Sequence, residues 1–547
     1  MPLSEGHSGQ AKPIYDGRKC QPFVPLKPVM AQRKKPLRPP KRPPALALAK
    51  VLWGRGRFDE ALGKFKEAVG QAPNDPLVLI DAGRAMAARH HVDRSMAFLE
   101  RALRLSPRRP DVQHAVGETY LALGRPAEAE ACFRRALVLA ATPQSQFELA
   151  KICERRHALD EAAELVDRVL RAEPRSLAAQ LLRARIERRR GEVDKARATL
   201  QRLIGLAEPS SPLLAEAYGE LCTLLDGAGE YDKAWEAILR CKQIQLAREA
   251  TAWQAAQFVL ARCRRMMEAI TKDHFDRWRL PDDVDSSQRL ALLTGFPRSG
   301  TTLLEQVLDA HPEVISSEEK EVFSAEVFPW LGEGRPPDAP IEELLDELPP
   351  SRLLAARQMY MDAMQAMPGE PIAGRLHVDK NPATNLMIPP MRRIFPELKF
   401  IVALRDPRDV VLSCFLRYLP VNPVSVCFLT LERTADRYVL DMEAWLKMRE
   451  MIDDWVEVRY EDAVTDLRRE AERTLAALGL PWDDAVLEYR SRAKQRQVLS
   501  PTYEAVAKPL FTSSLGRWQN YQRHLAPVLD RLAPLVRAFE YKDEWRK

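Results

Sequence analysis

One loop of the sequence carries residue types suited to holding an anion. Residues 290–294 form a short apolar run that predicts a buried strand, and residues 295–302 read Gly-Phe-Pro-Arg-Ser-Gly-Thr-Thr. A helix is predicted to follow directly, from Thr301 to about Asp309. A glycine-bounded loop at the start of a helix aims backbone N–H groups and the positive helix end at one point. The pattern predicts a phosphate-binding loop, although a plain strand–helix turn could share this composition.

The side chains of this loop favour a tetrahedral oxyanion over a metal-bound triphosphate. A nucleotide-triphosphatase loop needs a lysine where this chain has Thr301, and a hydroxyl that holds magnesium. The loop instead offers the guanidinium of Arg298, whose fork of donors matches such an anion. The hydroxyls of Ser299, Thr301 and Thr302 lie beside it in the sequence. These residues suit a phosphosulfate and require no metal.

A second cluster follows another predicted strand, residues 399–404. Arg405 comes directly after this strand, and Ser413 and Arg417 are expected on the next helix, four residues apart and on one face. Arg405 and Ser413 could converge on a second phosphate. The alternative is a surface ion-pair network between Arg405 and the aspartates that follow it.

Two strings of the sequence resemble sulfotransferases. Pro-Arg-Ser-Gly-Thr-Thr resembles their 5′-phosphosulfate loop, and Leu-Asp-Ala-His-Pro-Glu-Val, which ends at Val314, resembles the tyrosylprotein branch. The resemblance covers residues 289–518. It implies an α/β three-layer domain with a central parallel sheet and a P-loop-like sulfotransferase fold. It also implies 3′-phosphoadenosine-5′-phosphosulfate as the donor, with the cluster at Arg405 as the 3′-phosphate site.

The same resemblance assigns catalytic roles. Glu319 is implied as the base that takes the acceptor proton, with Glu318 as the fallback, and Lys380 as the cation that stabilises the leaving oxygen beside Arg298. The alternative interpretation is that Glu318 and Glu319 belong to a solvated acidic turn and that Lys380 is a surface lysine. His311 is the rival base, but its place next to a proline after a helix favours a structural role.

The implied donor-binding set is larger than the loop. It comprises Arg298, Ser299, Gly300, Thr301, Thr302, Arg405, Ser413, Arg417, Tyr460, Thr502, Lys508 and Arg517. The family has serine at the position of Thr502 and often lysine at that of Arg517. One departure concerns the acceptor: the tyrosylprotein enzymes hold acidic peptides with a basic pair, where this chain has Glu321 and Ala325. A protein tyrosine is therefore one candidate acceptor among glycans, lipids and small phenols.

The first half of the chain repeats itself. Between residues 45 and 246, small, aromatic and proline positions recur with a step of about thirty-four residues, the length typical of a helix–turn–helix repeat. Over about six units, this pattern resembles tetratricopeptide repeats, with the second and fourth units more degenerate. Such units stack into an all-α solenoid whose concave face commonly binds peptides or proteins. An intramolecular scaffold is the other interpretation.

The remaining segments complete a multidomain organisation. Residues 1–44 are a basic, proline-rich leader that is expected to be disordered and solvated, 247–287 a closing helix and linker, and 288–547 the sulfotransferase domain. The 83 basic and 77 acidic residues nearly balance, which argues against nucleic-acid binding. Eight scattered cysteines form no Cys-x-x-Cys metal or redox pair, and no apolar run would span a membrane, so the cytoplasm is expected.

Two other function classes stay open at this point. A nucleotide-dependent kinase would need a loop lysine and a magnesium carboxylate, and Thr301 argues against it. A repeat-based adaptor with an inactive nucleotide-binding domain would not need its charged catalytic positions filled, and here they are filled.

Overall fold

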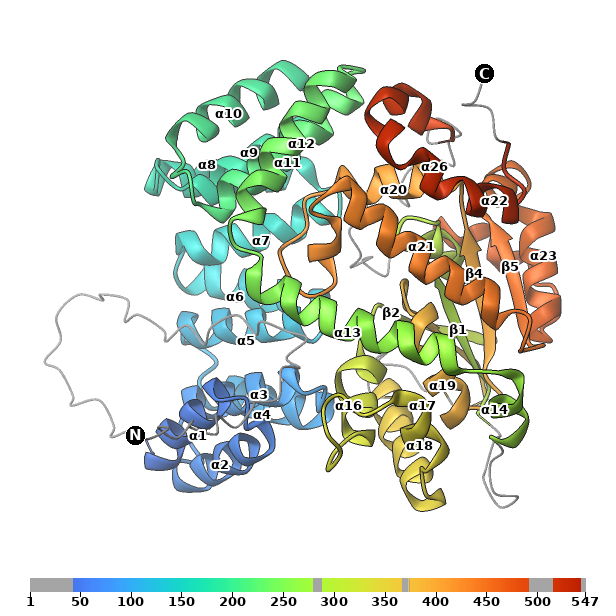
Figure 1. The fold of residues 1–547 in the computed structure, drawn as a ribbon. Helices are drawn as coiled ribbons and strands as arrows, with labels where there is room; N and C mark the ends of the chain where they lie inside the picture. Colours follow the sequence, from blue (N-terminus) through green and yellow to red (C-terminus); the bar gives the residue numbers. More distant parts are fainter. Residues whose placement is uncertain (1–42, 279–287, 366–371, 373, 491–514, 543–547) are drawn as a thin grey trace, which may run out of the picture.

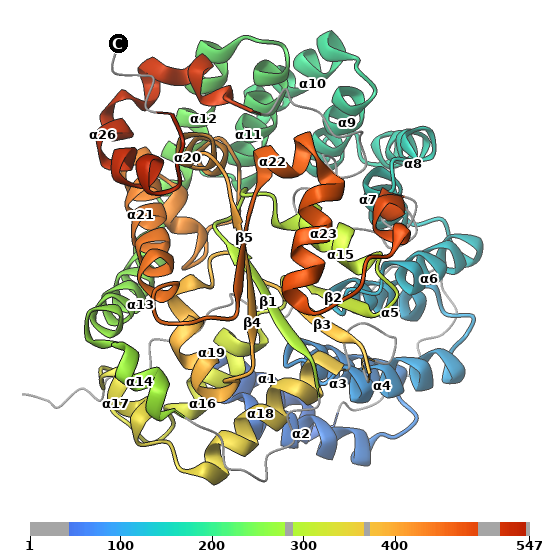
Figure 2. The same cartoon turned by 90° about the vertical axis from the view of Figure 1, so that its right-hand side faces the viewer.

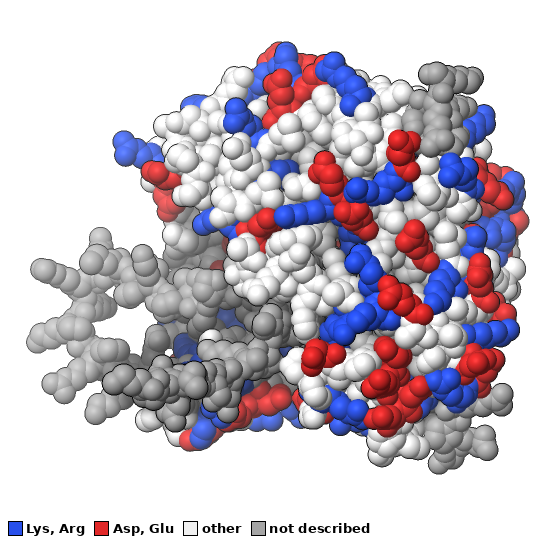
Figure 3. Space-filling view, in the orientation of Figure 1, with Lys and Arg blue, Asp and Glu red and all other residues white. Residues whose placement is uncertain are grey.

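A computed structural model describes residues 43–278, 288–365, 372, 374–490 and 515–542 of the chain. Figure 1 shows a curved row of helices that follows one side of a second part built around a sheet. Basic and acidic side chains are interspersed over the described part of the face seen in Figure 3, as the near balance of charge predicts. In the described part of the chain, no helix is both long and apolar enough to cross a membrane.

The curved row consists of helix pairs. The described residues form six of them: α1 (Pro44–Gly54) with α2 (Phe58–Gln71), α3 (Pro76–Ala88) with α4 (Val92–Leu105), α5 (Pro110–Ala122) with α6 (Pro126–Leu139), α7 (Pro143–Arg155) with α8 (Leu159–Ala172), α9 (Leu177–Arg189) with α10 (Val193–Leu206), and α11 (Pro212–Gly227) with α12 (Tyr231–Leu246). The predicted all-α solenoid is confirmed. Its first helix begins at Pro44, within the predicted leader, of which residues 1–42 lie outside the described range.

The turn inside each pair explains why two units look degenerate in the sequence. Each turn contains one residue with a positive φ, and in four pairs it is a glycine, such as Gly56 at 75° and Gly124 at 73°. In the second and fourth pairs His90 and His157 take this place, at 55° and 64°. Glycine adopts a positive φ without steric cost, whereas for other residues this left-handed conformation costs about 1–2 kcal/mol. The second and fourth helix pairs therefore form although their turns lack the glycine that marks the repeat in the sequence.

The second part contains a five-stranded parallel sheet. Its strands are β1 (Leu290–Gly295), β2 (Val314–Glu318), β3 (Leu376–Lys380), β4 (Lys399–Leu404) and β5 (Trp455–Arg459), in the order β2-β3-β1-β4-β5. The predicted strands at residues 290–294 and 399–404 correspond to β1 and β4, whereas β2 and β3 were not predicted. Since all five strands are parallel, their carboxyl ends meet at one edge, where open α/β sheets bind ligands.

Helices cover both faces of this sheet, as Figure 2 shows. Alternate strand residues enter two cores: Ala291 and Leu293 pack with α15 (Thr301–Asp309) and α23 (Leu467–Leu478), and Leu290 and Leu292 point to the opposite core. That second core contains α13 (Ala250–Ala269), α17 (Ile341–Asp346), α18 (Pro350–Gln365), α19 (Ile388–Ile394), α20 (Pro407–Phe415), α21 (Leu431–Met448) and α26 (Gln522–Ala538). Shorter helices are α14 (Lys272–Arg277), α16 (Phe328–Leu331) and α22 (Tyr460–Thr465). The three-layer α/β prediction is confirmed.

The solenoid and the sheet domain are joined by a common core. Buried residues of α11 and α12, including Trp235 and Ile238, belong to the same apolar cluster as α20, α21 and α26. The Trp235 ring lies 5.0 Å from that of Phe415 and stacks on His524 at 4.6 Å. A further contact joins His90 of the second helix pair to Glu326 of the sheet domain, at 3.6 Å. The solenoid therefore curves around the sheet domain and contacts it through its second and its last helix pairs.

Candidate active site

Two glycines shape the loop after β1. At Gly295, φ is 122°, and a Cβ would lie 2.3 Å from the carbonyl oxygen of Ala403 on the neighbouring strand. At Gly300, which caps the start of α15, φ is 100°, and a Cβ would lie 2.6 Å from the ring of Tyr460. Both positions exclude a side chain. The loop can therefore approach β4 and α22 closely and present the first N–H groups of α15.

Arg298 connects the two predicted anion-binding clusters. Its φ is 76°, a left-handed conformation that is uncommon outside glycine. Its Nε donates to Oγ of Ser413 at 3.1 Å, and Nη1 of Arg405 donates to its carbonyl oxygen at 3.4 Å. Burial and the neighbouring charge of Arg417 lower the pKa of Arg298. The ends of β1 and β4 thus contribute cations to a single region, which suits an anion.

The hydroxyl residues of the loop lie at the start of α15. Ser299, Thr301 and Thr302 are buried at this end of the helix. They lie at the positive end of the helix, toward which its backbone N–H groups point. Hydroxyls at this place can donate to the same anion as the backbone.

Arg405 and its surroundings form the far side of this region. The guanidinium lies 4.9 Å from the centre of the Tyr460 ring, and its Nη2 lies 3.5 Å from Oδ2 of Asp409. Asp409 also accepts the N–H groups of Gly516 and Trp518, at 2.9 and 2.8 Å. Burial raises the pKa of Asp409 to about 6, although Arg405 opposes this shift. Asp409 therefore fixes both Arg405 and the chain segment at Gly516.

The predicted catalytic pair lies at the ends of β2 and β3. The side chain of Lys380 is fully buried, and its Nζ lies 2.7 Å from Oε1 of Glu319, 3.4 Å from Oε2 of Glu305 and 3.9 Å from Oε1 of Glu318. Burial alone would lower the pKa of Lys380, but the three carboxylates raise it, which keeps the ammonium charged. The Glu319 side chain is 36% exposed, against 14% for Glu318, so Glu319 is the more accessible carboxylate.

The backbone of Glu319 is also unusual. Its φ is 46°, and its N–H donates to the carbonyl oxygen of Lys380 at 2.8 Å. A glutamate in this left-handed region costs about 1 kcal/mol or more, and such residues cluster at functional sites. The turn directs Glu319 away from the direction of its strand while its side chain remains on Lys380.

Glu305 is a member of this cluster that sequence reasoning missed. It lies on α15, one turn beyond the loop, and its side chain is only 2% exposed. Its Oε1 accepts from Oγ of Ser316 at 3.2 Å. Burial raises the pKa of Glu305 to about 8, against the pull of Lys380. The available signal was a charged residue within the apolar stretch of a predicted helix.

Other predicted donor-binding residues lie differently from the expectation. Arg417 is not on the helix with Ser413, because α20 ends at Phe415; Arg417 lies in the chain that follows. The guanidinium of Arg517 forms an ion pair with Asp226 of the solenoid. Thr502 and Lys508 lie outside the described residues.

His311 has a structural environment. Its Nδ1 accepts the N–H of Glu313 at 3.1 Å, and its Nε2 lies 3.0 Å from the carbonyl oxygen of Pro481. The ring is buried, and both nitrogens are therefore engaged with the backbone. This agrees with the interpretation of His311 as a packing residue rather than a base.

The arrangement is suited to group transfer between an anion and a hydroxyl. Arginines gather at the ends of β1 and β4, and a lysine–carboxylate pair lies at the ends of β3 and β2. In the described ranges, no group of three or more His, Cys, Asp or Glu residues has metal-binding geometry. Among the carboxylates of β2 and α15, the ammonium of Lys380 takes the central position.

Comparisons with known proteins agree with this description. Residues 291–484 match the Sulfotransferase family, and residues 52–117, 115–172 and 155–212 match Tetratricopeptide repeat families. An uncharacterized protein of Aquifex aeolicus is 25% identical over 389 residues, which cover 68% of this chain. The chain spans 48% of that relative's length.

Two further similarities concern the sheet domain. Protein-tyrosine sulfotransferase 1 of Danio rerio is 27% identical over 267 residues, which cover 45% of this chain and 71% of the relative. The sulfotransferase domain of the Synechococcus PCC 7002 olefin synthase is 21% identical and covers 44% of this chain and 91% of its own, with a TM-score of 0.33.

Proposed function

Because the chain carries a sulfotransferase-family domain behind tetratricopeptide repeats, we propose that it moves a sulfuryl group from 3′-phosphoadenosine-5′-phosphosulfate to a hydroxyl acceptor. The observation that carries this proposal is the meeting of Arg298, Ser413 and Arg405 in one region, next to the Lys380–Glu319 pair. A donor phosphorylated at both ends of its ribose needs two anion sites within one nucleotide's length, and we propose that this cluster provides both.

In the reaction, the Lys380–Glu319 pair and the arginine cluster at this edge of the sheet would have different roles. Glu319 takes the proton of the acceptor hydroxyl as the acceptor oxygen bonds to sulfur. The bond between sulfur and the bridging oxygen breaks, and that oxygen leaves with its electron pair on adenosine 3′,5′-bisphosphate. Lys380 and Arg298 neutralise the developing charge. Such transfer depends mainly on positioning and charge stabilisation, so these residues suffice without a metal.

The test uses matched glutamates. We expect Glu319→Gln to bind adenosine 3′,5′-bisphosphate in calorimetry with an affinity close to that of the wild type. Its turnover with radiolabelled donor should fall by about a hundred- to ten-thousand-fold, the range of general-base catalysis. Glu318→Gln is the control, because its side chain lies farther from Lys380 and is less exposed. Unchanged turnover in Glu319→Gln would remove Glu319 from the mechanism, and a loss only in Glu318→Gln would transfer the role.

The same calorimetry separates the other function classes. Tight binding of adenosine 3′,5′-bisphosphate supports sulfuryl transfer, and tight binding of ATP instead would support a kinase. Binding of neither nucleotide would favour an adaptor. The kinase is the weaker alternative because the loop has Thr301 where a kinase loop of this type has lysine.

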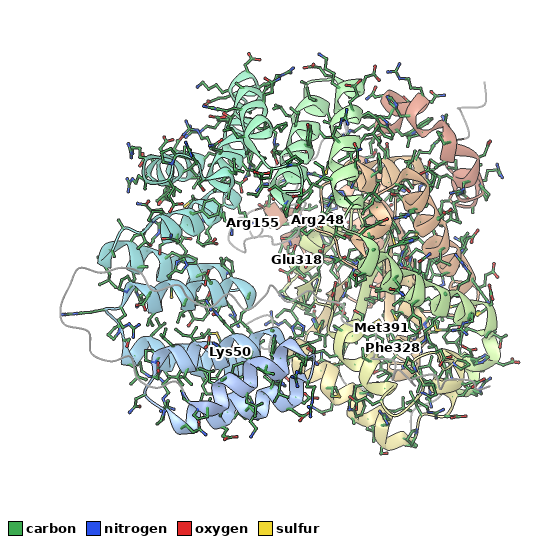
Figure 4. All side chains as sticks on the ribbon, turned by 60° about the vertical axis from the view of Figure 1, so that its left-hand side comes forward. Lys50, Arg155, Arg248, Glu318, Phe328 and Met391 are labelled. Carbon is green, nitrogen blue, oxygen red and sulfur yellow. The ribbon has the colours of Figure 1, made fainter. Side chains whose placement is uncertain are left out.

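For the acceptor we propose a polypeptide, of which a tyrosine hydroxyl is one candidate. Figure 4 places Arg155 of α7, Arg248 after α12 and Glu318 of β2 around the space between the solenoid and the sheet. Tetratricopeptide repeats commonly hold peptides on their concave face, which favours a polypeptide acceptor. Incubation with radiolabelled donor and a cell extract, followed by gel electrophoresis, tests this. Label only in protease-resistant glycan or lipid would contradict it.

A further inference from the structure

The last helix pair of the solenoid reaches the anion-binding region itself. The chain that follows α20 carries Arg417. Side chains of α12 hold this segment: Nζ of Lys242 donates to the carbonyl oxygen of Arg417 at 2.7 Å, and Nε2 of Gln245 donates to that of Leu419 at 2.6 Å. The solenoid therefore fixes the chain directly after the helix on which Ser413 lies.

A second contact comes from α11. The carboxylate of Asp226 forms an ion pair with the guanidinium of Arg517 through Oδ2, and accepts from the hydroxyl of Tyr521 through Oδ1 at 2.7 Å. The backbone around Arg517 is held from the other side, since Asp409 accepts the N–H groups of Gly516 and Trp518. Arg517 is thus fixed by its backbone to the sheet domain and by its side chain to the solenoid.

The segment at Arg517 adjoins the anion-binding region, because Asp409, which holds its backbone, also lies 3.5 Å from Nη2 of Arg405. The charges of Arg417 and Arg517 each help to lower the pKa of Arg298, after the larger effect of burial. Lys242 is itself buried, and its ammonium lies 5.7 Å from the ring of Phe415 at the end of α20. Several cations held together without an anion are unfavourable, so their placement requires fixed partners.

We propose that the last helix pair of the solenoid is part of the donor site, with Asp226 as a positioning residue that holds Arg517 toward the 3′-phosphate. This rests on the proposed function. Asp226 is separated from Arg517 by almost three hundred residues of sequence, and neither repeat pattern nor donor loop predicts the contact. The solenoid is then a structural component of the nucleotide pocket as well as a surface for partners.

The experiment measures nucleotide affinity of the full-length chain by calorimetry. Asp226→Ala should bind adenosine 3′,5′-bisphosphate about tenfold more weakly, the scale of one charge-assisted hydrogen bond. Its affinity for adenosine 5′-phosphate should change less than threefold, because the backbone beside Arg517 is bonded to Asp409, the partner of Arg405 at the proposed 3′-phosphate site. Asp226→Asn should recover part of the loss, since its amide oxygen can still accept from Arg517 and Tyr521.

The matched control is Asp232→Ala. Asp232 lies on α12 and pairs with Arg523 and His524 of the C-terminal helix, so it joins the same two parts without touching Arg517. It should bind both nucleotides within twofold of the wild type. Equal affinity in Asp226→Ala and wild type would overturn the inference, and so would an equal loss for both nucleotides or an equal loss in Asp232→Ala. A wild-type chain that binds no adenosine 3′,5′-bisphosphate would instead refute the proposed function, and this inference with it.

Discussion

Replacing Glu305 with glutamine should stabilise the protein progressively as pH rises from 5 to 8, relative to the wild type. Burial raises the pKa of Glu305 to about 8 in the folded protein, against an ordinary value of 4.5. Below pH 4.5 the carboxyl is protonated in both states, and its favourable contribution is fully present. Between pH 4.5 and 8 the unfolded chain releases this proton while the folded chain retains it. Stability is therefore lost as pH rises.

The size of the effect follows from this interval. Each unit of pKa difference corresponds to about 1.36 kcal/mol, so the free energy of unfolding falls by roughly 4 kcal/mol between pH 5 and pH 8 because of Glu305 alone. For a domain of this size, 1 kcal/mol moves the thermal midpoint by about 2 °C. The midpoint of Glu305→Gln, relative to wild type, should thus rise by roughly 8 °C across this range. Glutamine does not titrate, and its amide oxygen can keep the bond from Ser316.

Thermal unfolding followed by circular dichroism at half-unit pH steps measures this difference. The groups that face Glu305 are Lys380 of β3, Glu318 of β2, Glu319 directly after β2, and Asp309 of its own helix, and all are present in both proteins. Glu313→Gln is the control, because the Glu313 carboxylate is 48% exposed and should show no such trend. A midpoint difference that stays constant from pH 5 to 8 would mean that Glu305 is already ionised in the folded protein, which would refute the raised pKa.

Three further changes test the site. Gly300→Ala should weaken binding of adenosine 3′,5′-bisphosphate at least tenfold, because the new Cβ would lie 2.6 Å from the Tyr460 ring and residue 300 has a φ of 100°. Calorimetry measures this affinity, and a wild-type value would refute the role of the close approach between the loop and Tyr460. Lys380→Met should abolish turnover and lower the thermal midpoint more at pH 8 than at pH 5. The reason is that the carboxylates around Lys380 would lose their cation, and a buried, unpaired carboxylate costs about 3–5 kcal/mol when it is ionised. An equal loss in the midpoint at both pH values would contradict this. His311→Ala should lower the thermal midpoint through two lost backbone hydrogen bonds and leave the pH dependence of turnover unchanged; an altered pH profile would make His311 a candidate base again.

Local sequence was sufficient for the donor loop and for the solenoid. The observed bounds of β1, α15 and β4 differ by at most one residue from the prediction, because apolar runs and a glycine-bounded turn specify them without distant partners. The six helix pairs could also be predicted from the sequence, since each repeats the same small and aromatic positions. Even the two degenerate units fold alike, with His90 and His157 in the left-handed position.

Distant pairing explains what the sequence did not reveal. Strands β2 and β3 were missed because each combines apolar residues with buried polar ones. These polar groups find partners only across the fold: Nε2 of His377 lies 3.1 Å from Oγ of Ser317, and Asp379 accepts from the hydroxyl of Tyr360 at 2.7 Å. Lys380 and Glu319 are 61 residues apart in sequence, so resemblance to a family could imply their contact, whereas their spacing alone could not predict it. The resemblance to sulfotransferases implied no role for Glu305, so it was not identified from the sequence.

The strand order separates opposite charges along one edge of the sheet. β1 lies between β4, whose end carries Arg405, and β3, whose end carries Lys380 among carboxylates. In the proposed reaction, the donor anion would bind on the β4 side and the acceptor hydroxyl would give its proton on the β2 side. The ammonium of Lys380 has three N–H donors, so it can hold Glu319 at 2.7 Å and still donate to the leaving oxygen. Once Glu319 is protonated it no longer attracts Lys380, which frees the ammonium to approach the leaving oxygen.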